Sequence, residues 1–412
     1  MKKKLLSFLL CVVMVAAMVV ALAACGEKYD FVIWVGEGMK ELTAQQIDAF
    51  NETSTLKLKA KIEIQSEKNA VGAMTGKPKT SWPDVYCFAQ DQLATAINGG
   101  MLHTLNDASK AFIQEHNSDE TIAAATVGDR IRAYPMTADN GYFMYYDTRV
   151  ITNEAHLTSL EDLIADCKAA GKKFSMKLAT TGGAWYAAAF FHAVGLESNW
   201  TIDNTGTFTG VNDTFHDQKG VIALQGIQKL FEAGTNVYQD SDSAEDFNAG
   251  TPSAVVISGI WDYNNAKKAL GDNLGIASLP KFTVDGEEYQ LRSYIGHKFM
   301  GIKPQTDAER SKYLQNLAMY LTSAECQKAR YDLSKWGPSD KSLSELTSPA
   351  LTALKATATV NQGQYPDGWW PEVVLMTDTM KKNSEGGNTD DAAALKVLLD
   401  SYYTKISALV KA

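Results

Sequence analysis

The residues of this chain best suited to chemistry are aromatic ones beside glycine or proline. They are Trp185-Tyr186 after Gly182-Gly183, Trp261 after Gly259, and Trp369-Trp370 between Pro366 and Pro371. An aromatic ring can cover the apolar CH face of a pyranose, while carboxylates and amides bind its rim of hydroxyls. Any one tryptophan could equally pack in a core. Their clustering in expected loops and helix starts predicts a cleft for sugars.

The sequence lacks the signatures of several enzyme classes. Gly36-Glu37-Gly38 follows an expected strand, but Glu41 stands where a dinucleotide loop needs its third glycine, and there is no Walker sequence. The six histidines lack the spacing of a zinc helix, and Ser258-Gly259 lacks the G-x-S-x-G elbow. Asp240, Asp242 and Asp246 miss two positions of a calcium loop and are interpreted as a solvated helix start. We therefore expect no catalytic residues, no metal and no cofactor.

Composition sets further limits. The 412 residues are 45% hydrophobic and 10% aromatic, enough for large buried cores in two domains. The formal net charge of −9 disfavours nucleic acid as a partner. Three cysteines, Cys87, Cys167 and Cys326, lie far apart beyond the first 25 residues, which favours lone thiols over a disulfide framework.

The first 25 residues have the order of a bacterial lipoprotein signal. Lys2, Lys3 and Lys4 precede an apolar run from residue 5 to 20, and Leu22-Ala23-Ala24-Cys25 looks like a lipobox. We expect cleavage after residue 24, lipid on Cys25, and a linker over residues 25–30. The domain would then sit on the outer face of a cell membrane, in a bacterium without an outer membrane. The alternative is an uncleaved membrane span, since residues 5–24 have the required length.

Strand and helix patterns alternate in the first third of the chain. Residues 31–35, 61–65 and 83–88 have the composition of strands. Thr43 and Gln46 form a capping-box pattern for the first helix, and residues 90–99 fit another that ends at a glycine pair. This alternation predicts βαβ units around a mostly parallel sheet.

The same pattern recurs later. A helix is expected after Thr158, another over residues 184–194, a buried strand over 254–258, and amphipathic helices after Thr306 and from residue 389 to 410. No internal repeat is visible. The chain is therefore expected to be an α/β protein of two lobes.

Several motifs in order resemble the extracellular solute-binding proteins of ABC sugar importers, specifically the maltose and maltodextrin-binding group (family 1), over nearly all of the mature chain. They are Val32-Ile33-Trp34, Pro83-Asp84-Val85, Phe88-Ala89-Gln90-Asp91, Ala133-Tyr134-Pro135, Phe247-Asn248-Ala249-Gly250, Gly259-Ile260-Trp261 and Leu279-Pro280. Each motif is weak singly, and their common order carries the resemblance.

The resemblance implies a periplasmic-binding-protein fold of type II, in which two lobes with mostly parallel sheets are joined by a hinge. It places the crossing segments near residues 137–142, 291–294 and 336–341. The N-terminal lobe would comprise residues 31–138 and 292–337, and the C-terminal lobe residues 139–291 and 338–412. Ligand would bind in the cleft between the lobes.

The resemblance also implies individual ligand-binding residues. Phe88, Trp185, Tyr186, Trp261 and either Trp369 or Trp370 match aromatic platforms, and Asp91 and Asp139 match cleft carboxylates. Glu37 matches an acidic residue of the first loop with spacing that differs by one residue. Gln92 replaces a family arginine, the basic residue expected after Glu37 is absent, and Gly183 replaces an acidic residue, so polar recognition has shifted.

The implied function is a lipid-anchored, monomeric receptor that captures maltose or maltodextrins and delivers them to the permease of an ABC importer by closing. Two alternatives stay open. The protein could bind a different oligosaccharide or a glycoside, since a fold does not fix its ligand. It could also be a surface-anchored glycoside hydrolase, in which two of Asp91, Asp139 and Glu37 act as opposed carboxylates.

Overall fold

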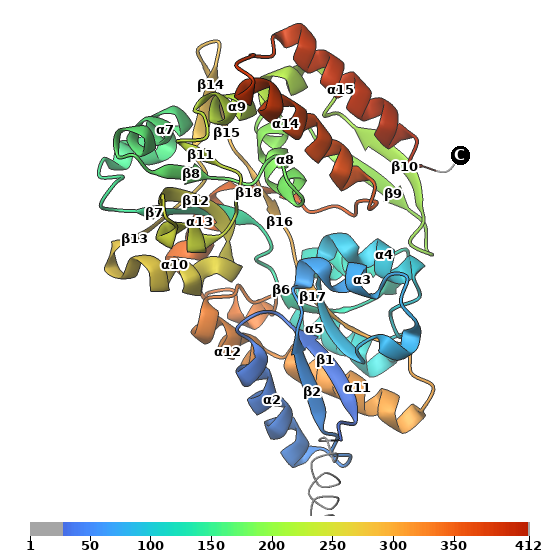
Figure 1. The fold of residues 1–412 in the computed structure, drawn as a ribbon. Helices are drawn as coiled ribbons and strands as arrows, with labels where there is room; N and C mark the ends of the chain where they lie inside the picture. Colours follow the sequence, from blue (N-terminus) through green and yellow to red (C-terminus); the bar gives the residue numbers. More distant parts are fainter. Residues whose placement is uncertain (1–27, 411–412) are drawn as a thin grey trace, which may run out of the picture.

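A computed structural model describes residues 28–410 of the chain. It has two α/β lobes, with the N-terminal strands in the lower lobe and the C-terminal helices in the upper one in Figure 1. The predicted signal peptide and Cys25 lie outside the described residues, as does the first half of the predicted linker, residues 25–27. Between residues 28 and 410, no helix combines the length and the apolar run that crossing a bilayer requires.

The sheet of the N-terminal lobe has the strand order β2-β1-β3-β17-β6. Strands β2, β1 and β3 are parallel, and β17 runs antiparallel to both β3 and β6. The strands are β1 (Phe31–Val35), β2 (Ala60–Ile64), β3 (Val85–Ala89), β6 (Tyr134–Thr137) and β17 (Lys298–Ile302). Two of the four pairings are parallel, so the sheet is mixed. β3 is buried along its whole length, and β1 is buried or half-buried throughout.

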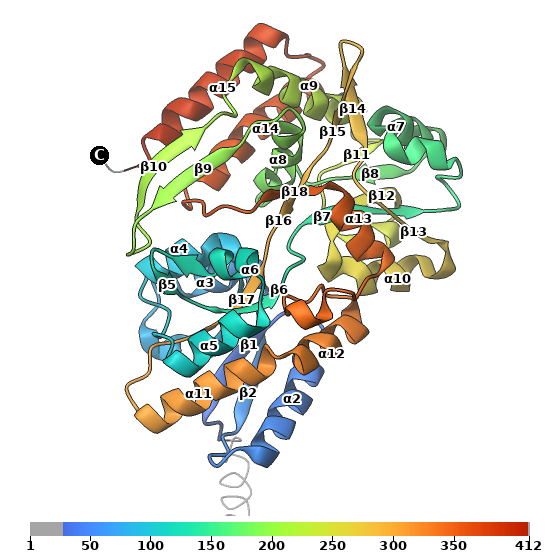
Figure 2. The same ribbon diagram turned by 180° about the vertical axis from the view of Figure 1, so that it is seen from behind.

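Helices cover this sheet, and Figure 2 shows α5 and α11 on its rear face. They are α2 (Lys40–Thr53), α3 (Ala70–Met74), α4 (Leu93–Asn98), α5 (Asp107–His116), α6 (Asp119–Ala124), α11 (Ala308–Leu321) and α12 (Ala324–Ser334). Short elements complete the lobe: η1 (Glu67–Asn69), η2 (Lys79–Ser81), η3 (Gln90–Gln92), η8 (Lys341–Leu343), β4 (Thr126–Val127) and β5 (Arg130–Ile131).

The sheet of the C-terminal lobe has the order β11-β8-β12-β7-β13. Strands β11, β8 and β12 are parallel, and β7 is antiparallel to both of its neighbours. They are β7 (Tyr142–Asp147), β8 (Lys173–Ser175), β11 (Tyr238–Gln239), β12 (Ser253–Gly259) and β13 (Leu274–Ala277). The lobe also has two antiparallel hairpins: β9 (Ser198–Ile202) with β10 (Phe208–Asp213), and β14 (Lys281–Val284) with β15 (Glu287–Gln290).

Helices pack on this sheet and on one another. They are α7 (Leu160–Ala169), α8 (Gly183–Ala193), α9 (Gln218–Glu232), α10 (Tyr263–Leu270), α13 (Pro349–Thr357), α14 (Trp369–Glu385) and α15 (Ala392–Ser407). The short turns are η4 (Glu154–Thr158), η5 (Ala244–Asn248), η6 (Ile260–Asp262) and η7 (Gly271–Asn273). Helix α8 is apolar on every side because α9, α14 and the segment of β16 (Ser293–Ile295) all pack on it.

Three segments cross between the lobes and are hydrogen-bonded to one another. The Ala138 N–H donates to the Gly337 carbonyl at 3.0 Å, and the Asn140 N–H donates to the Gly296 carbonyl at 3.0 Å. Strand β16 pairs with β18 (Ala358–Asn361), and the chain rejoins the N-terminal sheet at Lys298. This hydrogen-bonded strip is the junction around which the site residues gather.

Two predicted helix starts are wrong by a few residues. The first helix begins at Lys40, so Thr43 and Gln46 lie buried within it instead of forming a cap. The helix predicted after Thr158 is capped by the side chain of Ser159, which accepts from the Asp162 N–H. Packing of α2 against α11 and α12 extends the first helix beyond what its capping pattern indicates.

The three cysteines of the described chain are free and buried. Burial raises the pKa of the Cys87 and Cys167 thiols to about 12. The prediction of lone thiols is confirmed for this part of the chain.

Candidate functional site

Trp261 follows the end of strand β12 in the C-terminal lobe, next to the hydrogen-bonded strip between the lobes. Gly259 is the last residue of β12 and pairs in register with Tyr142 at the start of β7. The Trp261 ring folds back over Gly259, so a Cβ built there would lie 2.2 Å from the ring atom Cζ3. Glycine therefore makes room for the ring, which is half-buried.

Lys298 from the N-terminal lobe lies against this tryptophan. Its Nζ atom is 5.5 Å from the centroid of the Trp261 ring and 4.1 Å from the centroid of the Trp336 ring. Trp336 belongs to the third crossing segment and is 4% exposed. The Lys298 ammonium of the N-terminal lobe thus contacts one ring of the C-terminal lobe and one ring of the hinge, by contacts of the cation–π type.

Asp139 lies in the first crossing segment, 1% exposed. Its Oδ2 accepts from the Gly337 N–H at 2.6 Å, whereas Oδ1 is buried and has no hydrogen-bond partner among the described residues. The hydroxyls of Thr137 and Tyr142, on either side of this segment, are likewise buried and unpartnered within the described chain. The hinge therefore carries buried polar atoms whose hydrogen-bonding capacity the described residues leave unused.

Aromatic residues predicted for the C-terminal lobe are brought together beside Tyr142. Trp185 and Tyr186, in the first turn of α8, have ring centroids 5.9 and 4.9 Å from that of Tyr142. Trp185 also stacks on Tyr294 at 4.5 Å and lies 6.5 Å from Trp370. Trp185 and Trp370 are half-buried and Tyr186 is buried, so the two tryptophans have surface left for a ligand.

The adjacent tryptophans at the start of α14 face in different directions. Trp369 is fully buried, and its Nε1–H donates to the Tyr402 hydroxyl at 2.8 Å. Trp370 is partly exposed and contacts Tyr365 edge to face. Of the two candidates, only Trp370 has an accessible ring in this structure.

An ion pair accompanies the aromatic group. Lys177 Nζ lies 2.7 Å from Asp242 Oδ1, and the Tyr186 hydroxyl donates to Asp242 Oδ2 at 3.1 Å. Burial would raise the pKa of Asp242, but Lys177, together with Lys68 from the opposite lobe, holds this pKa below its usual range. Asp240 also accepts from two backbone N–H groups, of Leu178 and Ala179.

The interpretation of these carboxylates as a solvated helix start is therefore wrong for Asp240 and Asp242, whereas Asp246 lies in the first turn of η5. All three are half-buried, and Asp240 and Asp242 fix the loop that precedes α8 through their hydrogen bonds. Sequence alone gave no indication of this, because their partners lie about sixty residues away in the chain.

Other predicted residues of the N-terminal lobe have different surroundings. Phe88 is fully buried between Tyr86 and Phe299, so its faces are covered in this structure. Gln92 uses both ends of its amide within the lobe, accepting from the Val71 N–H and donating to the Glu67 carbonyl.

Glu37 and Asp91 complete the predicted set. Glu37 is exposed in the turn after β1. Asp91 Oδ1 accepts from Gln362 Nε2 at 2.9 Å. Their roles in binding stay predictions, as do those of Phe88 and Gln92.

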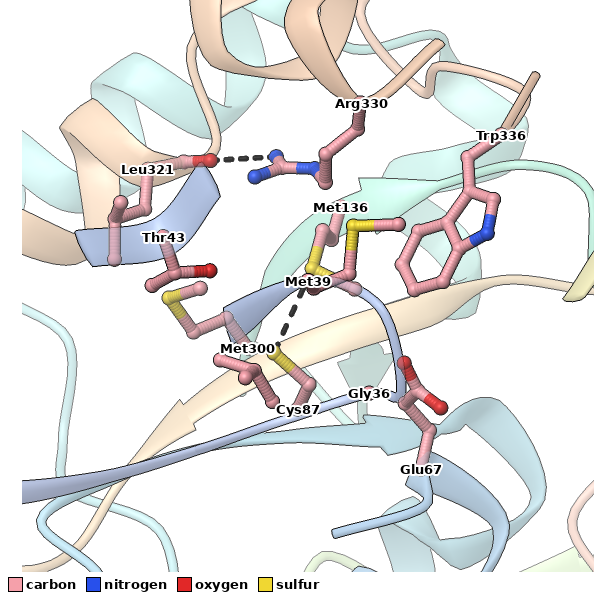
Figure 3. Close-up of a pocket in the computed structure, with 11 residues that line it drawn as sticks. Gly36, Met39, Thr43, Glu67, Cys87, Met136, Met300, Leu321, Arg330 and Trp336 are labelled. Atoms are coloured by element: carbon pink, nitrogen blue, oxygen red, sulfur yellow. Dashed lines mark hydrogen bonds between the residues drawn. The ribbon is translucent and has the colours of Figure 1, made fainter. Parts of the chain in front are cut away.

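A small cavity lies at the end of β1, next to Trp336. Figure 3 shows the side chains of Met39, Met136, Met300 and Cys87 around it, with the charged groups of Glu67 and Arg330 on its edge. Its volume is about 10 Å³, room for about one water molecule. Glu67 Oε1 and Arg330 Nε are buried and lack hydrogen-bond partners in the described chain.

A larger groove of about 440 Å³ opens elsewhere between the lobes. It is lined by α6, by Ile202 of β9 and by the segment 361–364, elements that face each other in Figure 2. Its lining is aliphatic and amide-rich and includes His297 but no tryptophan. Sugars stack on aromatic faces, so the strip between the lobes with its tryptophans is the better candidate site.

Within residues 28–410, no three histidine, cysteine or acidic side chains are grouped so that they could hold a metal ion.

The sequence analysis did not identify two residues of the candidate site. Lys298 could have been noticed as a charge within a buried strand, and Trp336 as an aromatic before a Gly-Pro pair. Their proximity depends on the lobes being joined, which local sequence does not encode.

Comparison with known proteins decides the class. The profile of the bacterial extracellular solute-binding proteins matches residues 45–359. The chain belongs to this family. The galactooligosaccharide-binding protein of Bacillus subtilis (strain 168) is 26% identical over 389 residues, spanning 88% of this solute-binding protein and 86% of the relative.

Solved structures confirm the two-lobe fold. One described as being with acarbose superposes with a TM-score of 0.77 at 25% identity, covering 94% of this chain and 100% of that one. A maltodextrin-binding protein from L. casei BL23, solved without ligand, gives a TM-score of 0.71 at 19% identity, covering 93% and 99%. The predicted resemblance to extracellular solute-binding proteins and the predicted fold class are both confirmed.

Proposed function

We propose that this protein is the receptor of an ABC importer and captures an oligosaccharide between its lobes. The observation that carries the proposal is the set of side chains gathered around the hydrogen-bonded strip between the lobes. Half-buried rings of Trp185, Trp261 and Trp370 lie on the C-terminal side, and Asp139 Oδ1, which has no partner in residues 28–410, lies on the hinge. Rings offer stacking surfaces and the carboxylate offers an acceptor for hydroxyls, the two features a pyranose needs.

Binding would act by closing the lobes. Three crossing segments form one hydrogen-bonded strip, around which the lobes can rotate. A sugar that touches both lobes gains more contacts in the closed form and therefore increases its population. Converting a mostly open to a mostly closed population takes about 5.5 kcal/mol of differential affinity. The permease of the importer would recognise the closed form, and the receptor would act as a monomer.

Maltose and maltodextrins are the proposed ligand class. The fold neighbours include a protein named for maltodextrin binding and a structure described as being with acarbose, which supports an α-glucan. Galacto-oligosaccharides are the second candidate, since the curated relative at 26% identity is named for them. Polar residues that differ from the family pattern, such as Gln92, fit either outcome.

Calorimetric titration of the mature chain with maltotriose, a β-1,4-galactotriose and an unrelated trisaccharide distinguishes these ligands. Chromatography of the same samples detects any cleavage. Saturable binding of an oligosaccharide without products supports the receptor, and the tighter ligand decides the class. Cleavage would establish a hydrolase instead, and binding of none of the sugars would reject the proposal. A Trp200→Ala variant, altered in the β9–β10 hairpin, is a matched control that should bind like the wild type.

We also propose that lipid on Cys25 anchors the receptor to the outer face of the membrane. An anchored receptor stays within reach of its permease at high effective concentration. A Cys25→Ser variant should be found in the culture medium with its sugar affinity intact, while uptake falls. Retention of this variant in the membrane would favour an uncleaved span over a lipid anchor.

A further inference from the structure

Lys298 is the most unusual charged residue of the described chain. It is the first residue of β17, and only 2% of its surface is exposed. Its Nζ has no hydrogen-bond partner among residues 28–410. A buried ammonium with unused N–H donors is costly to a protein unless some state of the molecule supplies acceptors.

The neighbours of this ammonium explain its position but leave its donors free. Trp336 and Trp261 attract the charge with their ring faces, at centroid distances of 4.1 and 5.5 Å. Aromatic faces stabilise a cation without accepting three directed hydrogen bonds. The two rings therefore hold Lys298 at the boundary between the lobes while its hydrogen-bonding capacity stays open.

An open acceptor lies on the same strip of backbone. Asp139 Oδ2 is bound to the N–H of Gly337, the residue that follows Trp336, and its Oδ1 is buried without a partner in the described chain. Lys298 is paired in the sheet with Thr137, two residues before Asp139. No ion pair joins Asp139 and Lys298 among the described residues. Near Trp336 and Gly337, the Lys298 ammonium and Asp139 Oδ1 thus both lack a hydrogen-bond partner among the described residues.

We propose that Lys298 is a ligand-binding residue that determines specificity, donating to one hydroxyl of the sugar unit that stacks on Trp261, while Asp139 Oδ1 accepts from a neighbouring hydroxyl. The proposal rests on the oligosaccharide function proposed above. Vicinal hydroxyls can accept from one group and donate to the other, so one neutral pyranose satisfies both. Trp336 then acts as a positioning residue that fixes the ammonium.

The competing explanation is that Lys298 is only a latch, whose contact with Trp261 holds the lobes together. The two roles predict different effects when Lys298 is replaced. Loss of a direct donor removes the contribution of one ligand hydroxyl, whereas loss of a latch weakens every ligand by the same factor. A double-mutant cycle between residue 298 and single ligand hydroxyls measures this coupling.

The experiment uses the mature protein and whichever of maltotriose and β-1,4-galactotriose the wild type binds, with a set of its monodeoxy analogues. Lys298→Met keeps the length of the stem and removes the donors. Lys110→Met, on an exposed helix face, is the matched control. Melting temperatures show whether each variant is folded, and Lys298→Leu, which also lacks donors, replaces the methionine variant if that one is not.

We expect Lys298→Met to bind the parent sugar about tenfold or more weakly. One deoxy analogue should lose at least tenfold with the wild type but less than twofold with the variant. Equal weakening of the parent and all analogues would overturn the proposal in favour of the latch, and unchanged affinity would overturn it outright. Failure of the wild type to bind either trisaccharide would instead reject the proposed function, a result that is seen before any variant is compared.

Discussion

Asp91 and Gln362 join the two lobes, since the Gln362 amide donates to Asp91 Oδ1 at 2.9 Å. The carbonyl of Gln362 also accepts from Gln90 Nε2 at 2.7 Å, so the segment before α14 is tied to the N-terminal lobe twice. A carboxylate predicted to bind sugar hydroxyls is thus already engaged by the protein. A ligand at Asp91 would have to use its other oxygen or displace the amide.

Asp91 should make stability depend on pH. Burial raises the pKa of this carboxyl to about 6, with a smaller contribution from Asp367, although the Gln362 hydrogen bond opposes the shift. Because the folded-state pKa lies above the unfolded value of about 3.9, the group stabilises the fold fully below pH 4, and this stabilisation is lost as pH rises through 6. We expect a loss on the order of 2 kcal/mol from this group between pH 4 and pH 7.

Urea unfolding of the wild type and Asp91→Asn at several pH values measures this contribution. The free-energy difference between the two proteins should change with pH in the stated direction. Asp107→Asn, which alters a fully exposed carboxylate, serves as the control. A difference between wild type and Asp91→Asn that is constant from pH 4 to 7 would contradict the raised pKa.

Alanine substitutions of the two adjacent tryptophans of α14 should affect different properties, sugar binding for Trp370 and stability for Trp369. Trp370→Ala removes a half-buried ring beside Trp185 and should weaken sugar binding by about 2 kcal/mol with little change in stability. Trp369→Ala empties a core site and loses the hydrogen bond to Tyr402, so it should lower the free energy of unfolding by about 3 to 5 kcal/mol. Calorimetric titration and thermal melts distinguish them, and a reversed pattern would assign the ligand to Trp369.

Gly259→Ala should act on Trp261 without touching the ligand. The added methyl would lie within 2.6 Å of three ring atoms, so the ring must move from its place at the junction. Gly250→Ala, whose Cβ would meet nothing within 4 Å, is the control. We expect about tenfold weaker binding for the first variant and unchanged binding for the second, measured by tryptophan fluorescence. Equal affinities in both variants would remove Trp261 from the site.

The buried cysteines should be inert in the native protein. Burial keeps Cys87 and Cys167 protonated, with a pKa of about 12, and Cys326 is buried as well. A disulfide reagent at pH 8 should therefore react with the protein lacking residues 1–27 only slowly, and with three thiols after unfolding in urea. Rapid reaction of the native protein would show that one of these sites is open.

Sequence predicted the elements that are determined by local composition. Apolar runs such as 31–35 and 254–258 become buried or half-buried strands because both faces of each mixed sheet are covered. Helix starts were less accurate, as at Thr43, because neighbouring helices extend an element beyond its local capping signals.

For the candidate site, sequence indicated which residue types to expect but not which way they face. Trp369 and Trp370 are adjacent in the sequence, yet Trp369 is buried in the core and Trp370 is partly exposed. Their difference arises from helical rotation and from packing on α8 and α15. Lys298 and Trp336 meet only because the crossing segments pair with one another, an arrangement with no local signature.

The central claim is that an oligosaccharide binds between the lobes at this junction. A crystal structure of the mature chain with the trisaccharide that it binds most tightly tests this claim most directly. The account predicts closed lobes, with one sugar ring stacked on Trp261 and its hydroxyls at Asp139 Oδ1 and Lys298 Nζ. Sugar density in the groove beside α6, or anywhere outside the aromatic junction, would contradict it.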